Sequence, residues 1–172
     1  MGLVWRALDW LFCIFFLVHI PITLLIDLQI FTTDFHPKPL VDYAKSWALE
    51  NGEPFLSPAV APMWFRTVVA MELLFQVPFF IIAVPAFYHQ SPRYNWMRIP
   101  CIIYATQAIT AILPILAEML LIDYSKEEIG PKTPAQVSGL LVAYLPFLIV
   151  PVLLLFRVLS CQQLWPKIFK AA

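Results

Sequence analysis

Charged side chains are scarce in this sequence. Lys, Arg, Asp and Glu make up 13% of the 172 residues, whereas 61% are hydrophobic, and the mean hydropathy is +0.79. A water-soluble domain needs more polar side chains than this to cover its surface. The scarcity of charge therefore excludes a soluble globular domain and indicates an integral membrane protein.

The sequence also lacks the patterns that mark several other classes of protein. Its formal net charge is +0 and it has no basic run, whereas nucleic-acid binding requires clustered Lys and Arg. Its four glycines form no phosphate-binding loop and no nucleophile motif. The three histidines are dispersed, with no cysteine at metal-ligand spacing, which argues against a zinc site. We expect no metal, no cofactor and no nucleic-acid partner.

Cysteine is equally rare. Cys13, Cys101 and Cys161 fall in or beside the same ends of their predicted helices, which leaves nothing to pair on the opposite side of the membrane. This distribution argues against a disulfide framework. Cys161 is either an inert thiol or a palmitoylation site, and we favour the inert thiol.

Long apolar runs, by contrast, fill most of the chain. A membrane-spanning helix needs about 20 apolar residues, and four runs meet this length. The predicted spans are 9–31, 64–88, 97–122 and 136–159. The longest connection, 32–63, contains a short amphipathic helix in VDYAKSWALE and is expected to cover the bundle as a lid. We predict an all-α membrane protein, one domain over 1–172, whose four kinked helices form an antiparallel bundle around a ligand pocket.

The distribution of basic residues predicts the orientation of this bundle. Four spans place both termini on one side, and the basic residues of that side are opposed by Asp9 alone. They are Arg6, Arg93, Arg98, Arg157, Lys167 and Lys170. The positive-inside rule then places both termini in the cytosol and loop 32–63 in the lumen.

Prolines lie within every predicted span. Each removes a backbone hydrogen bond and clashes with the preceding turn, so kinks are expected in all four helices. They are Pro21, Pro78, Pro85, Pro114, Pro146 and Pro151. Bent helices cannot touch along their full length, and a gap between kinks favours a ligand cavity, although proline is also common in membrane helices generally.

Three carboxylates interrupt the apolar runs: Asp27, Glu72 and Glu118. An acid in hydrocarbon costs at least ~2.5–3.5 kcal/mol, so each needs a partner, a cavity or a proton. Glu118 lies about one turn from the end of its span and is expected to reach the headgroups or water. Asp27 and Glu72 are therefore the leading candidates for a functional site.

Other polar residues share faces with these two acids. His19, Thr23 and Asp27 recur at intervals of four residues, which places them on one face of a helix. Spans two to four contribute further polar side chains. These are Gln76, Thr106, Gln107, Thr110 and Tyr144. At ~1.5 Å per residue, both acids lie within about two turns of the same membrane boundary, so they are expected at one level.

Two carboxylates in one apolar pocket are expected to share a proton and to keep one negative charge. Such a pair suits a cation, and aromatic rings around it would add cation–π attraction to an amine. We expect these rings to be Phe75, Phe79, Tyr104 and Tyr144. A purely structural hydrogen-bonded pair is the alternative, but membrane helices usually use Ser, Thr, Asn or Gln for that purpose.

Several strings resemble one known family over essentially the whole chain. HIPITLLIDLQ at 19–29, MELLFQVPFF at 71–80, RIPCIIY, LPIL and the DYSK at 123–126 are similar to the EXPERA family, which includes the emopamil-binding sterol isomerases. The resemblance implies a four-helix protein of the endoplasmic reticulum membrane, with the nuclear, lysosomal and plasma membranes as further locations. It also implies a homodimer, a pocket for sterols or oxysterols and hydrophobic amines, a role in cholesterol homeostasis, and a cholesterol transporter as a partner.

The resemblance assigns roles to individual residues. Asp27 looks like the carboxylate that pairs with a ligand amine, and Glu72 like the acid that hydrogen-bonds Asp27. Glu53 looks like the loop acid that braces the lid. The remaining ligand-binding residues are expected to be His19, Gln76, Tyr144, Thr110 and Ile26. The sequence departs from the family at Phe147, where a Tyr is expected, at Glu118, where no charge is expected, and in lacking a Lys-rich tail.

Two functions stay open from the sequence. A binding protein needs only the anionic pocket, whereas a sterol double-bond isomerase needs an acid and a base placed to move protons. In the isomerases of this family a His shares the second helix with its acids, and FRTVVAMELLFQ has none. This favours binding over catalysis. A channel is the weakest reading, because four helices with so few polar faces leave little room for a conduction path.

Overall fold

The computed structural model describes residues 3–56, 61–127 and 129–166. Four helical segments are long and apolar enough to cross a membrane, and the described residues include no strand. The segments are Leu3–Phe35, Met63–His89, Pro92–Leu121 and Pro134–Leu159. They confirm the predicted all-α class and its four spans, with the first span beginning six residues earlier than predicted. Lys167 and Lys170, which entered the charge count, lie outside the described residues.

Each segment is built from shorter helices. The first contains α1, the π-helical turn η1, α2 and the 3-10 turn η2. Their bounds are Leu3–Ile22, Thr23–Asp27, Gln29–Thr32 and Thr33–Phe35. The second contains α4 (Met63–Met71), the π-helical turn η3 (Glu72–Gln76) and α5 (Val77–His89). The third contains the 3-10 turn η4 and α6, and the fourth α7 and α8. Their bounds are Pro92–Met97, Arg98–Leu121, Pro134–Tyr144 and Pro146–Leu159.

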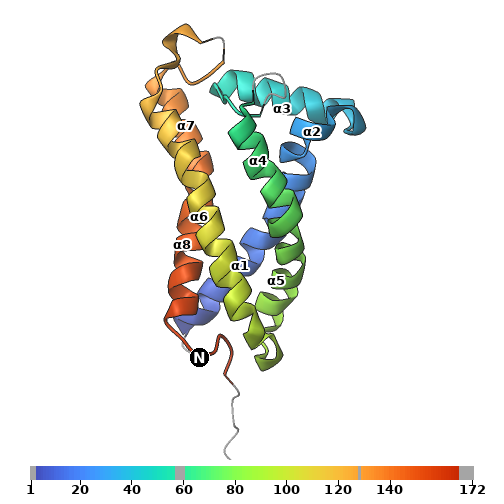
Figure 1. Cartoon of the computed structure of the whole chain (residues 1–172), viewed down its shortest axis with the longest axis vertical. Helices are drawn as coiled ribbons and strands as arrows, with labels where there is room; N and C mark the ends of the chain where they lie inside the picture. Colours follow the sequence, from blue (N-terminus) through green and yellow to red (C-terminus); the bar gives the residue numbers. More distant parts are fainter. Residues whose placement is uncertain (1–2, 57–60, 128, 167–172) are drawn as a thin grey trace, which may run out of the picture.

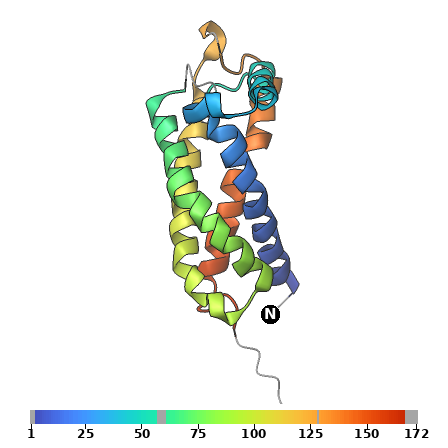
Figure 2. The ribbon, with the colours of Figure 1, turned by 90° about the vertical axis from the view of Figure 1, so that its right-hand side faces the viewer.

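The four segments stand side by side, and successive segments run in opposite directions (Figures 1 and 2). Helix α1 packs along α5, and α6 packs along α8. The N-terminus lies at one end of the bundle, which we call the terminal end. Helix α3 (Lys38–Asn51) lies across the opposite, loop end, where Figure 2 shows it end-on. The amphipathic helix predicted in VDYAKSWALE is thus confirmed.

Prolines account for the interruptions in three segments. The π-helical turn η1 begins two residues after Pro21, and η3 ends two residues before Pro78. Within η1 and η3 the backbone bonds span five residues, as where the Leu28 N–H donates to the Thr23 carbonyl at 2.9 Å. Helix α7 ends two residues before Pro146, whereas α6 runs unbroken through Pro114. Single π turns inside helices are frequent at functional sites, and both π turns here carry a candidate acid.

The chain after α3 and the chain between α6 and α7 are in close contact at Gly52. Gly52 ends α3 with φ of 66°, in the left-handed region that favours glycine. A Cβ at this position would lie 2.7 Å from the Gly130 carbonyl oxygen. Any side chain would therefore push Gly130 and Pro131 away from α3.

Two apolar clusters hold the bundle together. One fills the half near the terminal end and is rich in aromatic rings, including Phe12, Phe16, Phe80 and Phe87. The other lies near the loop end and joins α4, α6 and the chain after α3. Packing against both clusters fixes the positions of α1, α4 and α7, whose side chains form the candidate site.

A buried ion pair closes the terminal end. Asp9, on α1, is fully buried, and its Oδ1 lies 3.2 Å from Nε of Arg157 on α8. The Trp165 indole N–H donates to Asp9 Oδ2 at 3.0 Å, and Arg157 donates to the Leu164 carbonyl at 2.8 Å. This network ties the segment after α8 to α1. The positive-inside rule places Asp9 on the cytosolic face, but a count of charges cannot identify Arg157 as its partner.

Candidate ligand-binding cavity

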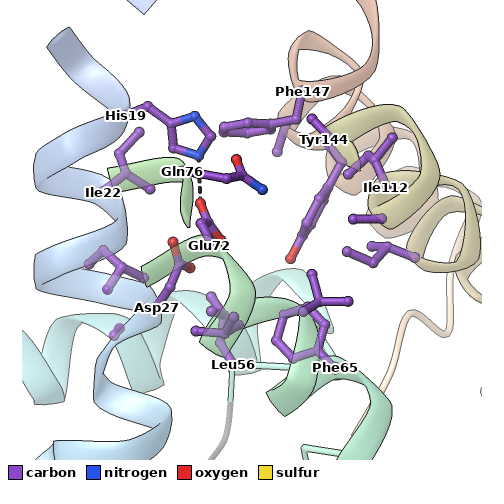
Figure 3. Close-up of a pocket in the computed structure, with 18 of the residues that line it drawn as sticks. His19, Ile22, Asp27, Leu56, Phe65, Glu72, Gln76, Ile112, Tyr144 and Phe147 are labelled. Carbon is purple, nitrogen blue, oxygen red and sulfur yellow. Dashed lines mark ion pairs between the residues drawn. The ribbon is translucent and has the colours of Figure 1, made fainter. Parts of the chain in front are cut away.

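A cavity of about 480 Å³ lies in the half of the bundle nearer the loop end. Its walls come from α1, η1, α3, α4, η3, α6, α7 and α8, and most of its lining is apolar (Figure 3). The lining includes Ile22, Ile26, Tyr43, Trp47, Leu56, Phe65, Val69, Ile112, Ile115 and Phe147. Five polar side chains also line it: His19, Asp27, Glu72, Gln76 and Tyr144. Pockets of this size and character are typical of sites for small organic ligands.

The two π turns bring the acids to this cavity. Asp27 is the last residue of η1 and Glu72 the first of η3, and these turns lie against each other. Figure 3 shows both carboxylates pointing into the same space. The two acids therefore lie at one level of the bundle, as the sequence predicts.

Glu72 contacts side chains of α1 and η1. Its Oε1 lies 2.8 Å from Nε2 of His19 and accepts a hydrogen bond of 2.8 Å from the Thr23 hydroxyl. His19 is 6% exposed and Thr23 is fully buried. The resemblance had paired Glu72 with Asp27. The contacts of Glu72 in the structure are with His19 and Thr23, which lie two turns and one turn before Asp27 on the same helical face, and its pairing with Asp27 stays a prediction.

Asp27 has no such partner. Among the residues that the structure describes, no donor lies within hydrogen-bonding distance of its carboxylate, which faces the cavity. An ionised carboxylate in an apolar site is costly unless it is paired. The cavity therefore offers an unsatisfied acceptor to a donor or a cation from outside the protein.

His19 is enclosed by aromatic rings. Its ring stacks on Phe80 with centroids 4.8 Å apart, and it meets Phe147 and Phe15 edge-on at 4.8 and 5.2 Å. Its Nδ1 is buried without a partner among the described residues. The imidazole therefore presents one bonded nitrogen to Glu72 and is held rigidly by packing.

Glu53 connects the loop end to the cavity wall. Its Oε1 accepts a hydrogen bond of 2.8 Å from the Tyr144 hydroxyl, and its Oε2 accepts from the backbone N–H groups of Phe55 and Leu56 at 2.9 and 2.6 Å. Glu53 is fully buried, and burial raises the pKa of its carboxyl above the ordinary value, against the lowering effect of these bonds. This geometry fits the bracing role that the resemblance assigned to Glu53.

Thr110 lies apart from this cavity. Its side chain is exposed on α6 and donates to the Thr106 carbonyl at 2.8 Å, as Thr106 does to Ile102. Both threonines line a second hollow on the outer side of α4 and α6. The prediction that Thr110 lines the ligand cavity is therefore wrong. The sequence predicts the helix that carries Thr110 but not the rotation that turns this side chain outward.

The aromatic walls also differ from those expected. Phe75 is 61% exposed, and Phe79 stacks on Tyr104 in the cluster near the terminal end, with ring centroids 4.7 Å apart. Of the four predicted rings, only Tyr144 lines the cavity. The other aromatic lining residues are Tyr43, Trp47, Phe65 and Phe147. Two of them come from α3, which the sequence predicts as part of a lid without showing which of its side chains reach the cavity.

Glu118 lies outside the cavity near the loop end. It is half-buried and accepts a hydrogen bond of 3.4 Å from the hydroxyl of Tyr124. Burial, with the nearby Glu118 carboxylate, raises the pKa of Tyr124 to about 12. Within the described residues, no group of three or more His, Cys, Asp or Glu side chains could hold a metal ion.

Comparison with known proteins places this chain in a family. Residues 35–158 match the model of the EXPERA (EXPanded EBP superfamily) family. The chain is 38% identical to sigma intracellular receptor 2 of Macaca fascicularis over 159 residues, covering 90% of this chain and 88% of the relative. The human protein of that name is 37% identical over the same shares, and that of Xenopus tropicalis is 36% identical over 90% and 89%.

A four-helix membrane protein with acids facing an apolar cavity is the class that the fold and site define. This chain belongs to the EXPERA family, and it is similar along nearly its whole length to the sigma intracellular receptors 2. The family predicted from the sequence is confirmed.

Proposed function

We propose that this protein is a membrane receptor that binds hydrophobic cationic amines and sterols within the bilayer. The unpartnered Asp27 carboxylate in an apolar, aromatic cavity supports this proposal most strongly. An ammonium group would supply the missing hydrogen-bond donor and the opposite charge in one contact. Trp47, Phe65 and Phe147 would surround the apolar body of the ligand.

Glu72 has a supporting role in this proposal. His19 and Thr23 both contact Glu72 Oε1, whereas Asp27 has no hydrogen-bond donor among the described residues, so Asp27 is the acid more open to a ligand. A neutral sterol would bind through the apolar lining, since burying apolar area contributes roughly 25 cal/mol per Å². One cavity therefore suits both ligand classes, with the charge favouring amines.

Matched ligands test this function on the unmodified protein. A lipophilic tertiary amine and its analogue with carbon in place of nitrogen have nearly the same shape and differ in charge. We expect the amine to bind at least about 100-fold more tightly, because a charge-assisted contact in a site of low polarity is worth several kcal/mol. Equal affinities for the two compounds would contradict the proposal.

The cellular setting is a proposal that rests on the resemblance and, for the orientation, on the distribution of basic residues. We place the protein in the endoplasmic reticulum membrane as a homodimer, with both termini in the cytosol, and with cholesterol homeostasis as its process. Its relatives of known name are intracellular receptors. A cholesterol transporter as partner is part of the same proposal.

A sterol double-bond isomerase is the second candidate, and the pair of His19 and Glu72 favours it. The stretch FRTVVAMELLFQ around Glu72 lacks a His, but the structure supplies His19 from α1, 2.8 Å from the carboxylate of Glu72. An isomerase adds a proton at one carbon and removes one from another, which such a pair could perform. Incubating the purified protein with a Δ8-sterol in deuterated water tests this. Deuterium in a shifted-alkene product, lost in His19→Phe, would support catalysis, whereas unchanged sterol would exclude it.

A further inference from the structure

A second hollow lies on the outer side of the bundle, between α4 and α6, and we call it the outer groove. Its lining includes Val68 and Ala111 together with Thr106, Gln107 and Thr110. These last three polar residues lie in the middle of a membrane-spanning segment. Thr106 and Thr110 donate to backbone carbonyls of α6, whereas the amide of Gln107 keeps donors that no described residue uses.

The wall between the outer groove and the cavity is thin. Val68 and Ala111 line both hollows, so a single layer of side chains separates them. Ala111 is small, and Figure 1 shows α4 and α6 diverging toward the loop end. A modest shift of α4 relative to α6 would join the two spaces.

A pair of amides crosses this wall. Gln76 lines the cavity, Gln107 lines the outer groove, and the Gln76 amide donates to the Gln107 carbonyl oxygen at 2.8 Å. Gln107 is half-buried, so its side chain is reachable from the groove. An amide has spare donors and acceptors, which a polar head group passing through hydrocarbon would otherwise lack.

The backbone next to Gln76 is suited to movement. Gln76 is the last residue of the π turn η3, which interrupts the helical hydrogen-bonding pattern between α4 and α5. A segment with altered hydrogen bonding can absorb a change in helix direction. Movement of α4 about η3 would open the wall at Val68.

We propose that the outer groove is the membrane-side entrance of the cavity, through which lipophilic amines dissolved in the bilayer pass Gln107 and Gln76 to reach Asp27. This inference rests on the proposed binding function. The rival route runs past α3, where Tyr43 lines the cavity and is 63% exposed. Kinetics distinguishes the two routes, because narrowing an entrance slows entry and exit alike and leaves the equilibrium unchanged.

The test places a bulky side chain in the outer groove without touching the cavity. Thr110→Trp is the test variant, and Leu113→Trp, on the same helix and outside both hollows, is its control. Both positions are exposed, so neither change should disturb packing. The probe is tritiated octyl-benzylpiperidine, and its association and dissociation are followed with the full chain in liposomes.

We expect Thr110→Trp to slow association and dissociation together by about tenfold, with Kd unchanged and Leu113→Trp like the unmodified protein. Ile103→Trp, also exposed in the groove, should repeat this result. Unchanged association and dissociation rates in both Thr110→Trp and Ile103→Trp would overturn the proposal that the outer groove is the entrance. A changed Kd with an unchanged association rate would overturn it as well. Absence of saturable binding in the unmodified protein would instead overturn the proposed function.

Discussion

The Tyr144 hydroxyl donates a hydrogen bond of 2.8 Å to the buried carboxylate of Glu53. This contact joins the connection after α3 to α7, at the wall of the cavity. The same carboxylate caps the backbone N–H groups of Phe55 and Leu56. One buried carboxylate therefore ties the loop end and the ligand site into one structural unit.

Glu53→Ala should destabilise this unit strongly. It leaves two buried N–H groups and one hydroxyl without acceptors, and each lost partner costs roughly 1–3 kcal/mol. Glu53→Gln should be much milder, because its amide oxygen can accept from the backbone while its NH₂ donates to the Tyr144 oxygen. Thermal unfolding in detergent and amine affinity should fall together in the Ala variant. An Ala variant with normal stability and affinity would contradict the bracing role.

The raised pKa of Glu53 predicts a pH dependence of stability. Burial favours its protonated form in the folded state, whereas the unfolded chain titrates near its ordinary value of about 4.3. Because the folded state binds more protons in this window, its contribution to the free energy of unfolding falls as the pH rises from about 4.3 through the folded pKa. Glu53→Gln should remove this contribution. Unfolding measured at several pH values checks it, and parallel curves for both proteins would refute it.

Removing only one charge of the ion pair between Asp9 and Arg157 should cost more stability than removing both. Asp9→Asn leaves the Arg157 guanidinium buried without its counter-charge, which typically costs about 3–5 kcal/mol. The double variant Asp9→Leu with Arg157→Met should recover much of this stability, because neither charge is then buried. Thermal unfolding of the single and double variants measures the difference. A double variant less stable than Asp9→Asn would contradict this account of the network.

The orientation is tested by chemical labelling. With the three native cysteines replaced, Arg6→Cys at the terminal end and Ser125→Cys at the loop end are both exposed positions. We expect an impermeant maleimide to label Arg6→Cys in sealed microsomes and Ser125→Cys only after permeabilisation, because the less opposed basic residues favour the cytosol. The reverse pattern would invert the topology.

Much of the fold was predictable because a membrane imposes a length on each apolar run. The site was predictable in part. His19, Asp27, Glu72 and Gln76 were found because acids are expensive in hydrocarbon and because helical spacing gathers polar residues on one face.

The rest depends on contacts between distant residues. Trp47 reaches the cavity only because α3 folds over the loop end, and Asp9 meets Arg157 across 148 positions of sequence. Thr110 faces outward because of the rotation of α6 about its axis. Apolar residues lie on all sides of α6, so the sequence does not specify this rotation. No pattern within one helix contains this information.

The most direct test of the account compares Asp27→Asn with Glu72→Gln. Asp27→Asn removes the only carboxylate left for an amine, so we expect a loss of roughly 3–5 kcal/mol in amine affinity. Glu72→Gln should lose less, because a Gln oxygen can still accept from His19 or Thr23. Sterol affinity should change little in either variant. Equilibrium titration of a tritiated lipophilic amine and a tritiated sterol against both purified variants gives the answer. The account predicts that Asp27→Asn alone abolishes amine binding, and full amine affinity in Asp27→Asn would contradict it.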